Sequence, residues 1–172
     1  NFYSTGTPDP LALDKFVLLE GTPPSYNNWC DLDRLLQTMS HIAAGYVLNK
    51  NLDKNSDKNK VAIAVGAKHG NPCGAAIELI SQKDQREIVE KTQTEIQKKV
   101  LVKMLASDPL AIFGGLIMVN FELNEDVCEA LTGKLFDGII APSFTPGAII
   151  MLRRKTDKCR FLINSALFEL NQ

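Results

Sequence analysis

The chain of 172 residues has little of the material that builds metal sites or disulfide frameworks. It has only two histidines, and its four cysteines are far apart, at Cys30, Cys73, Cys128 and Cys159. Because there is no C-x-x-C pair, and neither histidine stands at a ligand spacing from one, we expect neither a disulfide nor a metal site. Widely spaced, reduced thiols are typical of cytosolic proteins, so the cysteine pattern predicts a cytoplasmic location.

A surplus of charge and a long apolar run are also missing. The 19 Lys and Arg residues against 20 Asp and Glu residues give a formal net charge of -1. Binding nucleic acid by bulk electrostatics needs a basic surplus or a basic face, so we expect no nucleic-acid partner. No apolar run reaches the roughly 18 residues that span a bilayer, and no signal segment opens the chain, so we expect no membrane association. The first residue is Asn1 rather than Met, which predicts a fragment of a longer chain.

The chain does contain enough apolar material for one core, because 45% of its residues are hydrophobic and 23% are charged. This composition favours a single domain over residues 1–172. Short apolar runs predict strands at 16–19, 61–65, 110–120, 138–141 and 160–164. Apolar periodicity and capping residues predict helices from residue 31, over 84–106, from 124 and over 145–154, with a polar loop at 49–60. The alternation predicts an α/β fold: a three-layer sandwich with a mixed, largely parallel sheet between helical layers.

The polar, glycine-rich segment Lys68–Gly74, with the sequence KHGNPCG, follows the predicted buried strand 61–65. The carboxyl end of a buried strand is where open α/β sheets bind ligands. At such a position the Lys68 ammonium would keep the neighbouring His69 imidazole neutral by like-charge repulsion, which favours a general base. Asn71 can both donate and accept hydrogen bonds to a ligand. The alternative is a turn that carries a surface Lys–His pair.

Three further positions have a functional and a plain structural interpretation. Gly114 lies in Phe113-Gly114-Gly115, which interrupts a predicted strand and indicates either a bulge or the close approach of a ligand. Asp137 stands directly before a strand, where a carboxylate either binds ribose hydroxyls or is an ordinary exposed acid. Asn28 lies in Tyr26-Asn27-Asn28-Trp29, before the first predicted helix, where an asparagine either caps the helix or contacts a ligand.

Four segments stand in series along the chain: SYNN at 25–28, KHGNPCGAA at 68–76, SDPLAIFGG at 107–115 and DGIIAPSFTPGAI at 137–149. In this order, and with similar gaps, they resemble the aminoimidazole carboxamide ribonucleotide (AICAR) transformylase region of the bifunctional purine-biosynthesis enzymes. In that family a Lys–His pair stands within a K-H-x-N-P-C-G-type segment, followed by D-P-x-S-A-F-G-G and an I-I-A-P segment. The resemblance extends from about Leu18 to Leu162, and four matched segments in series are specific.

The resemblance implies formyl transfer from 10-formyltetrahydrofolate, the co-substrate, to the 5-amino group of AICAR. Lys68 and His69 match the catalytic pair. His69 would assist removal of the amine proton, and Lys68 would supply charge and proton transfer to the collapsing intermediate. Gly114 and Asp137 match nucleotide-contacting positions, and Asn28 matches a further one. We add Asn71 to the substrate site only because of its place in the Lys68–Gly74 segment. The family needs no metal.

The resemblance also implies a cytidine-deaminase-like fold, of which this chain would form the first of two halves, and a homodimer with the site built across its interface. An R-Y-G-x-N-P-H-Q segment, the second transformylase half and the cyclohydrolase domain are absent, and Ile112 departs from the small residue common in the family. The alternative function is therefore a degenerate, non-catalytic nucleotide-binding or scaffold module. A zinc deaminase is disfavoured because the chain lacks the His-x-Glu and Pro-Cys-x-x-Cys ligand pattern.

Overall fold

A computed structural model describes residues 6, 9–52, 60–80, 86–154 and 158–171 of the chain. Six strands form one sheet in the order β1-β6-β5-β4-β2-β3, with the bounds β1 Val17–Glu20, β2 Lys60–Lys68, β3 Asn71–Ile80, β4 Leu116–Val119, β5 Gly138–Ala141 and β6 Arg160–Ile163. The neighbours β4, β5 and β6 are parallel, whereas β1 pairs with β6, β2 with β4 and β3 with β2 in an antiparallel manner. Four of the six strands, β3 to β6, therefore point the same way, which confirms a mixed, largely parallel sheet.

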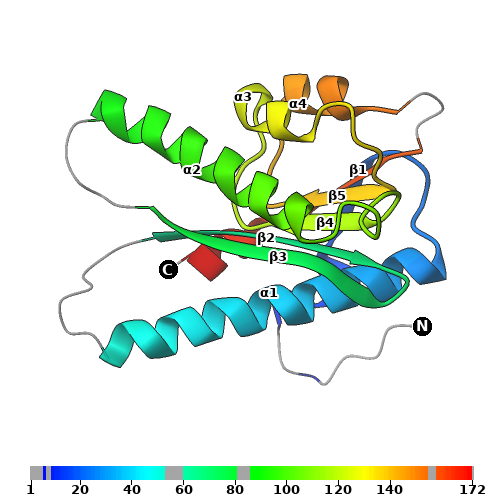
Figure 1. Cartoon of the computed structure of the whole chain (residues 1–172). Helices are drawn as coiled ribbons and strands as arrows, with labels where there is room; N and C mark the ends of the chain where they lie inside the picture. Colours follow the sequence, from blue (N-terminus) through cyan, green and yellow to red (C-terminus); the bar gives the residue numbers. More distant parts are fainter. Residues whose placement is uncertain (1–5, 7–8, 53–59, 81–85, 155–157, 172) are drawn as a thin grey trace.

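Helices cover both faces of the sheet (Figure 1). One face carries α1 (Tyr26–Leu52), and the other carries α2 (Arg86–Ser107), α3 (Glu125–Cys128) and α4 (Pro146–Leu152). Successive strand residues point to opposite faces, so β2 contributes to both layers: Ile63 packs on the α1 side and Ala64 on the α2 side. All residues from 61 to 67 are buried, as expected for a strand covered on both faces. The predicted three-layer α/β sandwich is confirmed.

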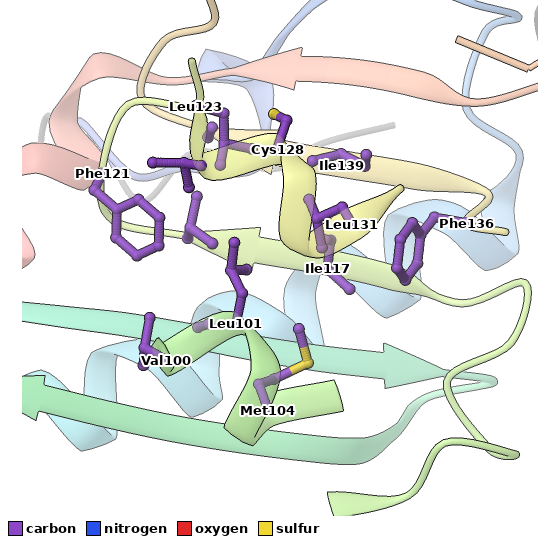
Figure 2. Packing of buried hydrophobic residues seen from close by; sticks show 14 of the residues in the cluster. Val100, Leu101, Met104, Ile117, Phe121, Leu123, Cys128, Leu131, Phe136 and Ile139 are labelled. Carbon is purple, nitrogen blue, oxygen red and sulfur yellow. The ribbon is translucent and has the colours of Figure 1, made fainter. Parts of the chain in front are cut away.

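Each face of the sheet has its own hydrophobic core. Figure 2 shows the core on the α2 side, where Leu101 and Met104 of α2 extend from the helix toward the sheet and cluster with Ile117 of β4. On the other side, Leu32, Leu35 and Met39 of α1 are almost fully buried against β2. Their spacing of three and four residues places them on one helix face. Burying each such side chain stabilises the fold by about 1.5–3 kcal/mol.

The first helix is longer than its apolar pattern predicts. It begins at Tyr26 rather than at Asp31 and ends at Leu52, so residues 49–52 of the predicted loop are helical. Residues 53–59 of that loop lie outside the described residues. In the first turn, Tyr26 and Asn27 are exposed and only Trp29 packs on the core as a half-buried apolar side chain, so the repeating apolar pattern begins later than the helix.

A strand is missing from the sequence prediction. Residues 66–74 do not form a loop: they extend β2 to Lys68 and, after a short turn, begin β3 along the edge of the sheet. Pro72 is compatible with an edge strand, which leaves one side of its backbone unpaired. At Gly74 an added Cβ would collide with the Met104 carbonyl oxygen, so this glycine lets α2 pack closely on β3.

The remaining elements lie close to their predicted positions, and the predicted helix cap at Thr145 is confirmed. Asn124 accepts the Val127 N–H at 3.0 Å at the start of α3, and the Thr145 hydroxyl accepts the Ala148 N–H at 3.3 Å at the start of α4. The strand predicted at 110–120 is shorter, because turns occupy the residues before Gly115 and only Leu116–Val119 forms β4.

All four cysteines are free thiols.

Among the helices of the described ranges, none combines the length and the hydropathy that crossing a bilayer requires.

Candidate functional site

A two-residue turn joins β2 to β3 and carries His69 at its tip. Lys68 pairs with Asn71 across the hairpin, which leaves His69 and Gly70 as the turn residues. Their φ angles are 54° and 76°, and two successive left-handed residues are the mark of a type I′ turn. Glycine adopts this conformation freely, whereas histidine does so at a cost in energy. The Asn71 amide Nδ2 donates to the His69 carbonyl oxygen at 3.2 Å, and both side chains are exposed.

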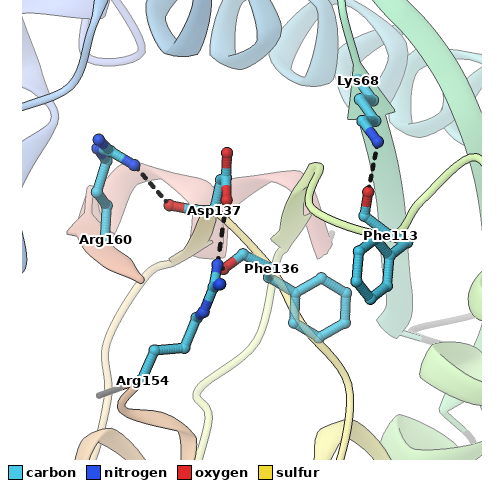
Figure 3. Close-up of polar contacts among 6 residues, drawn as sticks. All are labelled: Lys68, Phe113, Phe136, Asp137, Arg154 and Arg160. Atoms are coloured by element: carbon cyan, nitrogen blue, oxygen red, sulfur yellow. Dashed lines mark hydrogen bonds and ion pairs between the residues drawn. The ribbon is translucent and has the colours of Figure 1, made fainter. Parts of the chain in front are cut away.

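The Lys68 side chain extends from the end of β2 to the loop before β4. Its Nζ donates to the carbonyl oxygen of Phe113 at 2.5 Å (Figure 3). A Cβ added at Gly114 would lie 4.0 Å from the same Nζ, and Gly114 has a φ of 70°. Because the acceptor is a neutral carbonyl, this hydrogen bond orients the ammonium without neutralising its charge.

The glycines before β4 bring this loop against the end of β2. A Cβ at Gly115 would lie 2.6 Å from the Ala67 carbonyl oxygen, closer than real Cβ contacts come, so only glycine fits. The structure thus shows a left-handed turn at Gly114 and a close approach of two backbone segments at Gly115. Close approach of a ligand to Phe113-Gly114-Gly115 stays a prediction.

Asp137 precedes β5 and lies beside the same loop. Its N–H donates to the Gly115 carbonyl oxygen at 2.9 Å, and its own carbonyl oxygen accepts from Arg160 Nη1 at 3.1 Å. Its carboxylate Oδ1 accepts from Arg154 Nη1 at 3.2 Å (Figure 3). The Asp137 side chain is 45% exposed, so water screens this ion pair and it is weak. A ligand hydroxyl can therefore compete for the carboxylate.

Three separate segments thus meet at one end of the sheet and supply Lys68, Gly114 and Asp137. Because β2 runs antiparallel to β4, this end is the carboxyl end of β2 but the amino end of β4, β5 and β6. The Lys68–Gly74 segment thus begins at the carboxyl end of β2, as expected, and Asp137 lies at the entry of β5, also as expected.

Asn28 has a structural role in the first turn of α1. Its Oδ1 accepts the Ser25 N–H at 2.9 Å, while its N–H donates to the Ser25 hydroxyl at 3.3 Å. This reciprocal pair is a capping box in which Ser25 is the N-cap and Asn28 the third helical residue. Asn28 is 7% exposed, and contact with a ligand stays a prediction for Asn28 and for Asn71.

A cavity of about 660 Å³ opens beside the turn that carries His69. Gly70 borders it, together with Tyr26, Trp29 and Arg34 of α1. A larger cavity of about 1020 Å³ is lined by Lys60, Gln97 and Phe121 among others. None of the six predicted site residues lines either cavity, and the smaller one adjoins the candidate site only through Gly70, the neighbour of His69.

The sequence analysis missed Arg154 and Arg160, which flank Asp137. Both follow α4 in a charged stretch that looks like ordinary surface, and only the parallel pairing of β5 with β6 brings Arg160 to Asp137. With Lys68 they bring three cationic side chains to this end of the sheet, where the acids Asp31, Asp108 and Asp137 also lie. Among the described residues, no group of three or more Cys, His, Asp or Glu side chains could hold a metal ion.

The fold and the site define the class: an α/β sandwich with a charged, glycine-lined site at one end of its sheet. The family model described as AICARFT/IMPCHase bienzyme matches residues 1–170, and the chain belongs to this family. The family resemblance inferred from the four motifs is therefore confirmed.

Its relatives are much longer proteins. The chain is 28% identical over 166 residues to the bifunctional purine biosynthesis protein PurH of Brucella ovis, and equally similar to those of Brucella canis and Brucella abortus. Each alignment covers 96% of this chain but 25% of the relative, so the chain spans about a quarter of the length of the curated relatives it matches.

Proposed function

We propose that the chain serves purine biosynthesis by transferring the formyl group of 10-formyltetrahydrofolate to the 5-amino group of AICAR. It would do so as part of a cytidine-deaminase-like transformylase domain, in a cytoplasmic homodimer. The observation that carries the proposal is the meeting of Lys68, Gly114 and Asp137 from three distant segments at one end of the sheet. Family membership and the names of the relatives support a role in purine biosynthesis.

Formyl transfer requires that a base removes a proton from the AICAR amine, because this amine is a poor nucleophile whose lone pair is drawn into the ring and carboxamide. The amine nitrogen attacks the formyl carbon, and His69 accepts the amine proton as the new C–N bond forms. The Lys68 ammonium stabilises the resulting oxyanion and then gives a proton to N10 of the folate as the bond from N10 to the formyl carbon breaks. Transfer of the proton from His69 to Lys68 restores both groups.

The nucleotide would lie across this charged end of the sheet. Asp137, which is held by a weak, exposed ion pair, would accept hydrogen bonds from the ribose hydroxyls. Arg154 and Arg160 would then face the phosphate, since guanidinium groups match phosphate geometry. Gly114 leaves the space beside Lys68 Nζ open to the base. Asn28 and Asn71 would complete the contacts.

The test uses the longest natural protein that contains the chain. We expect Lys68→Ala and His69→Ala each to abolish formyl transfer while changing the melting temperature little, because a partly exposed lysine and a turn histidine contribute little packing energy. His41→Ala is the matched control, since His41 is an exposed histidine on α1. Asp137→Asn should weaken AICAR binding in calorimetry. Normal turnover in either the Lys68 or the His69 variant would remove the catalytic assignment.

A second candidate is a nucleotide-binding or scaffold module without turnover. The observation that favours it is the coverage of only a quarter of each relative, because the remaining length could supply groups that the reaction needs. AICAR binding that depends on Asp137, together with no formyl transfer by the longest natural protein, would support this second function over the first.

A further inference from the structure

Two side chains of α1 hold the turn that carries His69. Asp31 Oδ1 accepts the Gly70 N–H at 2.6 Å, and Arg34 Nε donates to the Gly70 carbonyl oxygen at 3.0 Å. One helix therefore binds both polar groups of a single glycine backbone. The hydrogen bonds of the hairpin ladder join Lys68 with Asn71, so the Gly70 groups need partners outside the hairpin.

Asp31 is placed to serve this contact. The residue is only 5% exposed, and an ionised carboxylate that is buried without a hydrogen-bond partner is costly. Arg34 follows three residues later on the same helix face. Its Nη1 donates to Gln37 Oε1 at 3.1 Å, and Gln37 in turn donates to Asp33 Oδ2 at 2.7 Å, which keeps the guanidinium in place.

The residues before and after His69 are therefore both hydrogen-bonded to other parts of the fold. Lys68 is hydrogen-bonded to the loop before β4, and Gly70 is hydrogen-bonded to α1. Within the described residues, no hydrogen bond involves the imidazole, so these contacts fix the His69 backbone and hence the point from which the ring extends. The left-handed φ of 54° at His69 is a conformation that persists only when surrounding contacts impose it.

We infer that Asp31 and Arg34 are positioning residues that set the His69 imidazole beside Lys68 by holding Gly70. The inference rests on the proposed function, in which His69 is the base. A small misplacement of a reacting group costs about 100-fold in rate, so loosening the turn should lower kcat. Neither residue needs to contact AICAR, so KM should stay within about twofold.

The experiment compares Asp31→Ala with Asp126→Ala in the longest natural protein that contains the chain. Asp126 is the matched control, because it is an exposed carboxylate on α3, on the opposite face of the sheet from α1. For Asp31→Ala we expect kcat to fall about 10- to 100-fold, KM for AICAR to hold within about twofold, and amide exchange over residues 68–74 to rise about tenfold. Asp31→Asn, which keeps an oxygen acceptor, should recover most of the rate, and Asp126→Ala should change neither quantity.

The outcomes separate this inference from the proposed function. If Asp31→Ala speeds exchange in the turn but leaves kcat unchanged while His69→Ala abolishes turnover, the positioning role is overturned and the function stands. If His69→Ala retains turnover, the proposed function fails whatever Asp31 does. Should Asp31→Ala not fold, Arg34→Met replaces it, since Arg34 is exposed; a severalfold loss of kcat supports the inference and an unchanged kcat overturns it.

Discussion

Gly70 and Gly45 both have open space where a Cβ would be built, yet alanine should act on them in opposite directions. Gly70 has a φ of 76°, a region that costs an L-residue about 1–2 kcal/mol, so we expect Gly70→Ala to lower the free energy of unfolding by that amount. Gly45 lies inside α1, where Gly45→Ala should raise it by about 0.5–1 kcal/mol. Urea denaturation measures both, and a neutral Gly70→Ala would contradict the left-handed turn.

The sequence predicted candidate site residues only where a motif marked them. Lys68, Gly114 and Asp137 were predicted from their segments, and the structure brings these three together. Asp31 and Arg34 were not predicted, because an acid and a base on a helix look like a solvated face. What distinguishes them is contact with Gly70, nearly forty residues away, and no local pattern contains that contact.

At the scale of the elements, two variants at the start of α1 can distinguish the capping role of Asn28 from contact with a ligand. Ser25→Ala and Asn28→Ala each remove one half of the same capping box, so we expect both to lower the free energy of unfolding by about 1 kcal/mol. If Asn28 also contacts the nucleotide, only Asn28→Ala should additionally weaken AICAR binding. Denaturation and calorimetry on the two variants measure the two effects, and equal affinities would leave Asn28 a cap alone.

The contact between α2 and β3 should depend on pH. Hydrogen bonds from Lys103 and Lys99 hold the pKa of Glu78 below its ordinary value, although burial opposes them. A folded-state pKa below that of the unfolded chain gives stability that is present above the unfolded value, about 4.3, and is lost as pH falls through the folded value.

We therefore expect Glu78→Gln to lower the melting temperature at pH 7 by about 1–2 °C, a small effect because both lysines are more than half exposed. Melting curves from pH 7 down to pH 3 should show the difference between the variant and the parent chain shrinking. A difference that stays constant with pH would contradict a charged contact.

Elements that bury continuous apolar runs were the predictable ones. Local pattern predicted the strands at 138–141 and 160–164 and the cap at Thr145, and the structure has them. The strand Asn71–Ile80 was missed because glycine, proline and exposed positions interrupt its pattern. Exposed and half-buried residues alternate along this edge strand. Pairing with β2 and the packing of α2 stabilise it.

At the scale of the whole molecule, the reactivity of the cysteine thiols shows how tightly the core on the α2 side is packed. Burial raises the pKa of Cys128 and of Cys159 to about 12, and both residues belong to the core on the α2 side. We expect both to resist a thiol reagent at pH 8 until the molecule unfolds. Cys30 and Cys73 are half-buried and should react in the native state, Cys73 more slowly than a free thiol because burial raises its pKa.

Counting reacted thiols with and without denaturant tests this expectation: two in the native state and four after unfolding. Reaction of three or four thiols without denaturant would mean that the core on the α2 side opens readily. The Cys128→Ser and Cys159→Ser variants show which thiol is responsible.

The overall architecture was predictable as a class, whereas its strand order was not. Alternating strands and helices predict an α/β sandwich, and the structure has that form. Nothing in the local pattern reveals that β2 is inserted between β3 and β4, or that it runs opposite to β4. That reversal is what brings the end of β2 to the amino ends of β4 and β5.

The pairing of β1 with β6 has a consequence for biogenesis. Of the six strands of the sheet, β1 is synthesised first and its partner β6 last, with Val17 opposite Ile163. A nascent chain must therefore carry β1 as an unpaired, half-apolar strand until β6 emerges. During that interval β1 is open to capture by chaperones or by neighbouring nascent chains.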